Sequence, residues 1–222
     1  MYKRVLTLLM ALALCGLAVD AKSRKSRGGA KSGTPGQFDY YLLSLSWAPD
    51  FCARTDSQRN SRECATGNQV GFIVHGLWPQ NENGSHPAQC APARPVASDI
   101  VTRMLPFMMD AGLIQHEWST HGTCSGLNTR DYFNSVTQVF QSVRIPEEYK
   151  TLKQTIQVSP SAITAKFAAA NPAFGNNAFR VSCLNDEVQE VRICFSKDLK
   201  ARACAPAERA CQASTIAMRP LR

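Results

Sequence analysis

Long apolar runs are scarce in this sequence of 222 residues. After residue 21, no stretch approaches the roughly 20 consecutive apolar residues that a membrane-spanning helix needs, so we expect no stable association with a membrane. The sequence also lacks Cys-x-x-Cys pairs, which are typical of structural zinc sites. It has no Gly-x-Ser-x-Gly motif, and neither Ser119 nor Ser125 has the partners of a serine-histidine hydrolase. These absences argue against a structural zinc protein and against a serine hydrolase.

The first 21 residues are typical of a secretory signal peptide. Lys3 and Arg4 precede an apolar run from Val5 to Val19, and the segment ends in Val-Asp-Ala. We expect cleavage after Ala21, which removes Cys15, and a secreted or periplasmic location. The compact length and the simple signal peptide favour a bacterial source.

Residues 22–36, KSRKSRGGAKSGTPG, lack apolar residues able to form a core, so we expect a basic disordered arm. The whole chain has 25 Lys and Arg against 17 Asp and Glu, a net charge of +8. This balance suits an anionic partner such as RNA, and solubility is the plainer alternative. The remaining length, 37–222, fits one domain with its own core.

The cysteines that follow the predicted signal peptide are even in number, which indicates disulfides in an exported protein. They are Cys52, Cys64, Cys90, Cys124, Cys183, Cys194, Cys204 and Cys211. Spacing leaves their connectivity open, because eight cysteines permit 105 pairings.

The apolar patterns predict an α+β fold in which a central antiparallel sheet packs with several α-helices. Strands are expected at FDYYLLSLSW (38–47), VGFIVHGLWP (70–79) and the alternating EVQEVRICF (187–195). Helices are expected at SDIVTRMLPFMMDA (98–111), TRDYFNSVTQVFQSVR (129–144) and PSAITAKFAAA (160–170). Pro106 should kink or divide the first of these helices. Strands and helices interleave without a regular repeat, which favours α+β.

The segment HEWSTHGTC (116–124) holds two histidines and a glutamate. In a helix, His116 and His121 would lie about 140° apart, whereas Glu117 and His121 would lie within about 40°. The spacing therefore disfavours the zinc-protease arrangement, in which both histidines share one helical face. It predicts instead that Glu117 pairs with His121, as suits an acid-base histidine held near a carboxylate.

A third histidine, His75, lies in FIVHGLWPQ (72–80), at the end of an apolar strand. A lone histidine there is more often structural, but three of the four histidines in the chain fall in these two segments. Two histidines can cleave RNA without a metal: one takes the proton from the ribose 2′-OH and the other protonates the departing 5′-oxygen. A third could stabilise the charge that builds on the phosphate oxygens.

FIVHGLWPQ and HEWSTHGTC together closely resemble the two active-site segments of the ribonuclease T2 family, which are secreted endoribonucleases. The segments DYYLLSLSWAP and EVRICF and the cysteine that closes the second motif agree with this family, so the resemblance covers roughly residues 38–211. It implies a ribonuclease domain over residues 37–222. It also implies a metal-independent transesterase that forms 2′,3′-cyclic phosphate ends and hydrolyses them more slowly to 3′-phosphates. We expect RNA as the partner, no cofactor and a monomer.

The resemblance also implies a role for each matching residue. His121 would be the general base and His75 the general acid. His116 would bind phosphate, and Glu117 would organise the transition state and tune His121.

The resemblance says less about the base pockets. Trp78 would contribute its indole to one pocket, with core packing as the alternative. Gln80 stands where some members have an acidic base-reading residue. Leu113 and Ile114 stand where many members are aromatic, which leaves the second pocket undefined. We assign Trp118 to the core.

One departure from the family pattern concerns charge. Thr120 stands where the family usually has a lysine, so a full positive charge is missing from the expected phosphate clamp. Either catalysis is weakened or another basic residue, such as Arg130, fills the gap. A rival hypothesis follows, in which the chain is a catalytically weak member that binds RNA or acts in signalling.

The family pattern finally implies a disulfide connectivity: Cys90 with Cys124, Cys183 with Cys211 and Cys194 with Cys204, which leaves Cys52 with Cys64.

Overall fold

The computed structural model describes residues 33–55 and 61–222. The predicted signal peptide and residues 22–32 of the predicted arm lie outside these ranges. Residues 33–36, which were predicted to belong to the disordered arm, lie against the domain, because the Gly36 N–H donates to the Cys124 carbonyl (2.9 Å). Within the described ranges, no helix has the length and apolar character needed to cross a bilayer.

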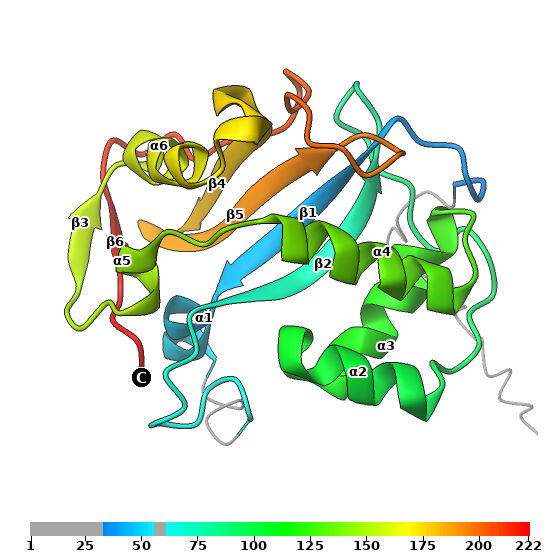
Figure 1. The fold of residues 1–222 in the computed structure, drawn as a ribbon, viewed down its shortest axis with the longest axis horizontal. Coiled ribbons are helices and arrows are strands. Elements are labelled where there is room, and N and C mark those ends of the chain that lie inside the picture. The colour runs from blue at the N-terminus through cyan, green and yellow to red at the C-terminus, as the bar shows by residue number, and fades with distance from the viewer. Residues whose placement is uncertain (1–32, 56–60) are drawn as a thin grey trace, which may run out of the picture.

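The described residues form a six-stranded sheet with the order β2-β1-β5-β6-β3, and β4 also pairs with β5 (Figure 1). The strands are β1 (Tyr40–Trp47), β2 (Phe72–Gln80), β3 (Ile156–Val158), β4 (Phe179–Leu184), β5 (Glu187–Phe195) and β6 (Ile216–Met218). All pairings are antiparallel except β5 with β6, which meet in parallel at Glu187 and Ala217. The three predicted strands and the mainly antiparallel α+β sheet are confirmed, whereas β3, β4 and β6 were not predicted.

The helices are α1 (Ala48–Arg54), α2 (Ser98–Met108), α3 (Ala111–Thr120), α4 (Thr129–Ser142), α5 (Glu147–Lys150) and α6 (Pro160–Ala170). Short 3-10 turns are η2 (Gly122–Cys124), η3 (Pro172–Phe174) and η4 (Asn176–Ala178). The predicted segment 98–111 divides after Pro106, because α2 ends at Met108 and α3 begins at Ala111. The two later predicted helices are confirmed as α4 and α6. Their N-caps are Asn128 and Ser159, whose side chains accept from backbone N–H groups of the first turn.

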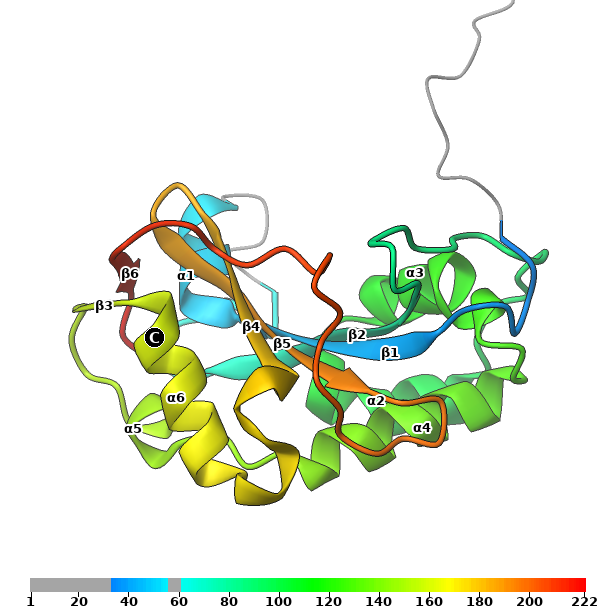
Figure 2. The same cartoon turned by 90° about the horizontal axis from the view of Figure 1, so that it is seen from above.

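The main core lies on one face of the sheet. Figure 2 shows α2, α4, α5 and α6 on one side of the strands and α1 on the other. Leu43 and Leu45 of β1 share this core with Tyr132 and Phe133 of α4. On the opposite face a small cluster of Tyr40, Leu42, Cys194, Cys204 and Ala205 packs against Trp78. The apolar residues thus leave the middle of the second face available to polar side chains.

The described cysteines form the four disulfides that the family pattern implied. Cys90–Cys124 joins the loop after β2 to η2, and Cys52–Cys64 closes the loop after α1. Cys183–Cys211 and Cys194–Cys204 tie the C-terminal segment to β4 and β5. The C-terminal segment is therefore covalently fixed to the sheet, and the loop after β2 is fixed to the turn that follows α3.

We predict that the hydroxyl of Tyr132 anchors α4 to the sheet. Tyr132 is fully buried, and its hydroxyl donates to the Leu77 carbonyl of β2 (2.9 Å). Tyr132→Phe leaves that carbonyl without this donor, so the free energy of unfolding should fall by about 1–2 kcal/mol. Urea denaturation with an unchanged m-value measures this loss.

Tyr149→Phe is the matched control. Tyr149 is also buried, but its hydroxyl makes no hydrogen bond to another described residue. The control should change the free energy of unfolding by less than about 0.5 kcal/mol. Equal losses in the two variants would contradict the prediction.

Candidate active site

Strand β2 carries a bulge at His75. Ser44 of β1 pairs with Gly76 and the next residue, Leu45, pairs with Val74, so His75 has no partner on β1. Because of this extra residue, Val74 and Leu77 both lie in the main core although three positions separate them. His75 is thereby free to face the opposite side, where its ring meets Trp78 at 5.1 Å.

Strand β5 has a matching irregularity. Ser182 of β4 pairs with Glu190 and Cys183 pairs with Val188, so Gln189 has no partner. Val188 and Val191 both lie in the core, and Glu190 faces the same side of the sheet as His75. The two bulges thus turn two polar side chains onto one face.

His75 and Glu190 meet across strand β1. The Nδ1 atom of His75 lies 2.6 Å from Oε1 of Glu190. Strand β1 lies between β2 and β5, and where it passes beneath this contact it presents Ser44 and Ser46. Two larger side chains there would obstruct the contact, whereas the serines leave room for it.

Glu190 is held by further polar contacts. Its Oε2 accepts from Nε of Arg192 (2.9 Å) and from the hydroxyl of Ser182 (3.4 Å). Arg192 also donates to Glu208 (2.9 Å), and its guanidinium lies 5.7 Å from the centre of the Trp78 ring. Burial disfavours the ionised form of Glu190, which is only 2% exposed, but the contacts with His75 and Arg192 lower its pKa to about 2. Glu190 is therefore a buried carboxylate anion.

Helix α3 places Glu117 against β2. The helix begins at its N-cap Asp110, whose side chain accepts from the Leu113 N–H (2.6 Å). Glu117 is 1% exposed; its Oε2 accepts from Nε1 of Trp78 (2.7 Å) and its Oε1 lies 3.8 Å from Nε2 of His75. A side chain at Gly76 would overlap this carboxylate, so the close approach of α3 requires glycine there. Burial raises the pKa of Glu117 to about 7, although His75 and Trp78 act in the opposite direction.

The predicted pairing of Glu117 with His121 is wrong. His121 caps the C-terminus of α3, where its backbone N–H donates to the Glu117 carbonyl (3.0 Å). The Glu117 carboxylate turns instead to Trp78 and His75 on β2. Helical spacing could not reveal this, because the competing partners come from a distant strand.

The environment of His121 disfavours a positive charge. Its Nδ1 atom is buried and has no hydrogen-bond partner among the described residues. Burial, together with the charges of His86, His116 and His75, lowers the pKa of His121 to about 3. The pKa of His75 shifts in the other direction: burial opposes its protonation, but the hydrogen bond and charge of Glu190, with the charge of Glu117, raise the pKa above its ordinary value. The two histidines therefore differ strongly in proton affinity.

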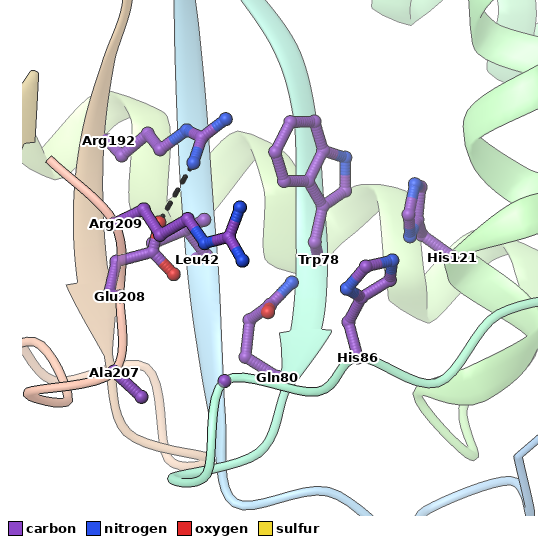
Figure 3. Close-up of a pocket in the computed structure, with 10 residues that line it drawn as sticks. Leu42, Trp78, Gln80, His86, His121, Arg192, Ala207, Glu208 and Arg209 are labelled. Carbon is purple, nitrogen blue, oxygen red and sulfur yellow. Dashed lines mark hydrogen bonds and ion pairs between the residues drawn. The ribbon is translucent and has the colours of Figure 1, made fainter. Parts of the chain in front are cut away.

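Two cavities open beside these residues. The larger, of about 510 Å³, is lined by Leu42, Trp78, Gln80, Gly84, His86, His121, Arg192, Ala207, Glu208 and Arg209. Figure 3 shows Trp78, His121 and His86 on one side, the two arginines and Glu208 on the other, and Gln80 between them. The smaller, of about 240 Å³, contains His75 and Glu190 together with Phe51, Glu63 and Leu113. The structure thus brings His75, Glu117, His121, Trp78 and Gln80 together.

Three other predicted positions lie apart from the cavities. His116 is exposed and Thr120 is half-buried, and neither lines either cavity. Arg130 does not fill the gap left at Thr120, because it pairs with Asp99 on the surface (2.9 Å). Trp118 belongs to the core, as predicted, and its ring packs on Tyr132 at 5.9 Å.

Five polar residues of the site were not predicted: Glu190, Arg192, Glu208, Arg209 and His86. The alternating polar positions of 187–195 were interpreted as a solvent-exposed face, and no sequence signal marks the bulge that brings Glu190 to His75. Within the described part of the chain, no group of three or more His, Cys, Asp or Glu side chains is arranged to hold a metal ion.

Comparison with known proteins shows that the chain is similar to ribonucleases. A ribonuclease of Aeromonas hydrophila is 37% identical over 116 residues, which cover 51% of this chain and 50% of that protein. A probable ribonuclease of Haemophilus influenzae is 29% identical over 183 residues, covering 75% of this chain and 61% of that protein. The chain therefore matches between about half and three fifths of the length of these curated relatives.

A solved structure, that of RNase NT in complex with 5′-AMP, shares the fold with a TM-score of 0.61 at 21% identity, covering 83% of this chain and 99% of that one. The model of the Ribonuclease T2 family matches residues 38–204, which include both histidine motifs and strands β1, β2, β4 and β5. The chain belongs to the Ribonuclease T2 family.

Proposed function

We propose that this protein is an endoribonuclease that cleaves single-stranded RNA by metal-independent transesterification. The products are 2′,3′-cyclic phosphate ends, which are hydrolysed more slowly to 3′-phosphates. The observation that carries the proposal is the pair His75 and His121, which flank Trp78 and whose pKa values are shifted in opposite directions. With pKa values shifted in opposite directions, one histidine can be protonated and donate a proton at the same pH at which the other is neutral and accepts one. Membership of the Ribonuclease T2 family supports the same activity.

The two histidines act in sequence on one phosphodiester. His121, held neutral, accepts the proton of the 2′-OH, and the 2′-oxygen attacks the phosphorus. His75, held protonated beside Glu190 and Glu117, gives its proton to the 5′-oxygen as the P–O5′ bond breaks. Hydrolysis of the cyclic phosphate reverses these roles, with water in place of the 5′-hydroxyl.

Positive charge near the phosphate comes from more than one residue. His116 is exposed on α3, five residues before His121, and would bind a phosphate oxygen. Thr120 offers only a hydroxyl where the family has a lysine. Arg209 lines the larger cavity and adds positive potential for an anionic ligand, whereas Arg192 is paired with Glu190 and Glu208.

The larger cavity suits a nucleotide base. Trp78 offers an indole surface there, and stacking of a base on such a ring is worth about 1–3 kcal/mol. Gln80 offers a carboxamide that can donate and accept hydrogen bonds. The structural neighbour RNase NT was solved with 5′-AMP, which supports nucleotide binding by this fold.

The proposal also includes an exported location. The four disulfides among the described residues require an oxidising compartment, in agreement with the predicted signal peptide. We therefore place the activity outside the cytoplasm, in the periplasm or the surrounding medium.

A second candidate function is favoured by Thr120. Without the lysine, the protein would be a weak catalyst that binds RNA through the same cavity. Turnover distinguishes the two: an enzyme cleaves many RNA molecules per protein, whereas a binding protein retains them intact.

The proposed activity can be tested by cleavage of an oligoribonucleotide in EDTA. The protein should cleave it with multiple turnovers and leave 2′,3′-cyclic phosphate ends, which mass spectrometry identifies. His121→Ala and His75→Ala should each reduce the rate by at least about 100-fold, because each removes one proton-transfer group.

A substrate with a single 2′-deoxynucleotide at the cleaved position is the matched control. It lacks the nucleophile, so cleavage at that linkage should stop while neighbouring linkages are still cut. Intact RNA after incubation with folded, disulfide-bonded protein would favour the binding protein, and activity that disappears in EDTA would contradict the metal-free mechanism.

The proposed roles of the two histidines also predict how kcat/KM depends on pH. His121 must be deprotonated, so kcat/KM should rise as pH increases through its pKa, which lies near 3. His75 must be protonated, so kcat/KM should fall as pH increases through its raised pKa, above the ordinary value of 6.5. The profile should therefore be a broad bell with an alkaline limb above pH 6.5. A rate that stays constant from pH 4 to 9 would refute this assignment.

A further inference from the structure

We propose that Glu190 is the positioning residue of His75: through the bond to Nδ1 it holds the imidazole with Nε2 directed at the reacting phosphate, and Arg192 fixes Glu190 in that place. The proposal rests on the proposed ribonuclease activity for its kinetic consequences, but the geometry is independent of it. Glu190 touches no part of the cleavage chemistry itself and acts only through His75.

The orientation of the imidazole follows from its two contacts. Nδ1 lies 2.6 Å from Glu190 on one side, and Nε2 lies 3.8 Å from Glu117 on the other. A carboxylate anion at Nδ1 keeps a proton there in both protonation states, so Nε2 is the atom that gains and loses the catalytic proton. Without this anion the ring could take the other tautomer or rotate.

Arg192 explains how a buried anion is tolerated at this place. An unpaired buried carboxylate would take up a proton and lose its charge. Arg192 donates through Nε to Glu190 and through Nη1 to Glu208, so it is fixed between two carboxylates. Its position is thereby determined by contacts on β5 and on the C-terminal segment.

Other charged groups face His75 and enter its titration. They are Glu190 and Arg192 from β5, Glu117 from α3, Glu63 from the smaller cavity, and His121. Arg54 and Asp110 line the smaller cavity as well. Glu117 lies 3.8 Å from Nε2 and itself has a pKa raised to about 7. Glu190 is the anion in direct contact, and its pKa of about 2 keeps it charged throughout the working range of the enzyme.

The test is the titration of His75 by NMR in the full oxidised chain. With only four histidines, the imidazole signals are few, and a His75→Gln variant identifies the signal of His75. The variants are Glu190→Gln, which keeps the shape but removes the charge, and Glu190→Asp, which keeps the charge. Glu148→Gln is the control, because it makes the same substitution at a carboxylate of α5 that pairs with Lys166 (3.2 Å) and lines neither cavity.

In Glu190→Gln, the pKa of His75 should fall by about one unit or more, a loss of at least about tenfold in proton affinity. The alkaline limb of kcat/KM should move to lower pH by the same amount. At optimal pH, kcat should fall by about 10- to 100-fold, as for other residues that orient a functional histidine, with little change in KM. Glu190→Asp should lie between Glu190→Gln and the wild type, and Glu148→Gln should match the wild type in both readouts.

Several results would overturn the proposal. A lower kcat in Glu190→Gln with an unchanged His75 titration would show that Glu190 is only structural. A wild-type His75 that titrates at or below pH 6.5 would show that no anion supports it, and this measurement needs no variant that folds. If the wild type fails to cleave RNA, the proposed function fails, while the titration still decides whether Glu190 holds His75.

Discussion

The hydrogen bond between His75 and Glu190 crosses strand β1, and the rest of the site depends on the geometry that allows this. A bulge in β2 and a bulge in β5 each add one residue to a strand, so the apolar residues on both sides of the bulge stay in the core. Were either strand regular, a slip of one residue would turn its polar side chain to the other face. The contact between His75 and Glu190 is therefore a property of the sheet and not of a flexible loop.

The surroundings of the two histidines differ in charge. Glu117 and Glu190 both approach His75, whereas His121 has a buried nitrogen that finds no partner in the described part of the chain and has other histidines near it. Because Glu117 and Glu190 are almost fully buried, their charges influence the proton affinity of His75 more than they would at the surface. Trp78 lies between the two imidazoles and ties the arrangement together by donating to Glu117.

The sequence was sufficient for the parts of the molecule that depend on local pattern. The strands at 38–47, 70–79 and 187–195 and the helices at 129–144 and 160–170 were predictable, because their apolar periods are clear. Short strands such as β3 and β6 were not, because three residues carry no period and owe their conformation to pairing. The two histidine motifs indicated His75 and His121, but Glu190 was hidden because a polar residue on an alternating strand suggests solvent. The error about Glu117 has the same origin: its partners lie on β2, and helical spacing contains no information about them.

The position of β6 in the sheet has a consequence for the order of folding. This strand, Ile216–Met218, lies between β5 and β3 and is the last strand of the sheet to be translated. β3 can therefore join the sheet only after β6 has been made. A nascent chain interrupted before residue 187 contains all three histidines of the motifs, but lacks β5, β6 and the anion that holds His75. Two disulfides also use cysteines from the last part of the chain, Cys204 and Cys211, and a third, Cys90–Cys124, closes a separation of 34 residues. Unfinished chains thus contain the three histidines of the motifs without the strands and the carboxylate that complete the site.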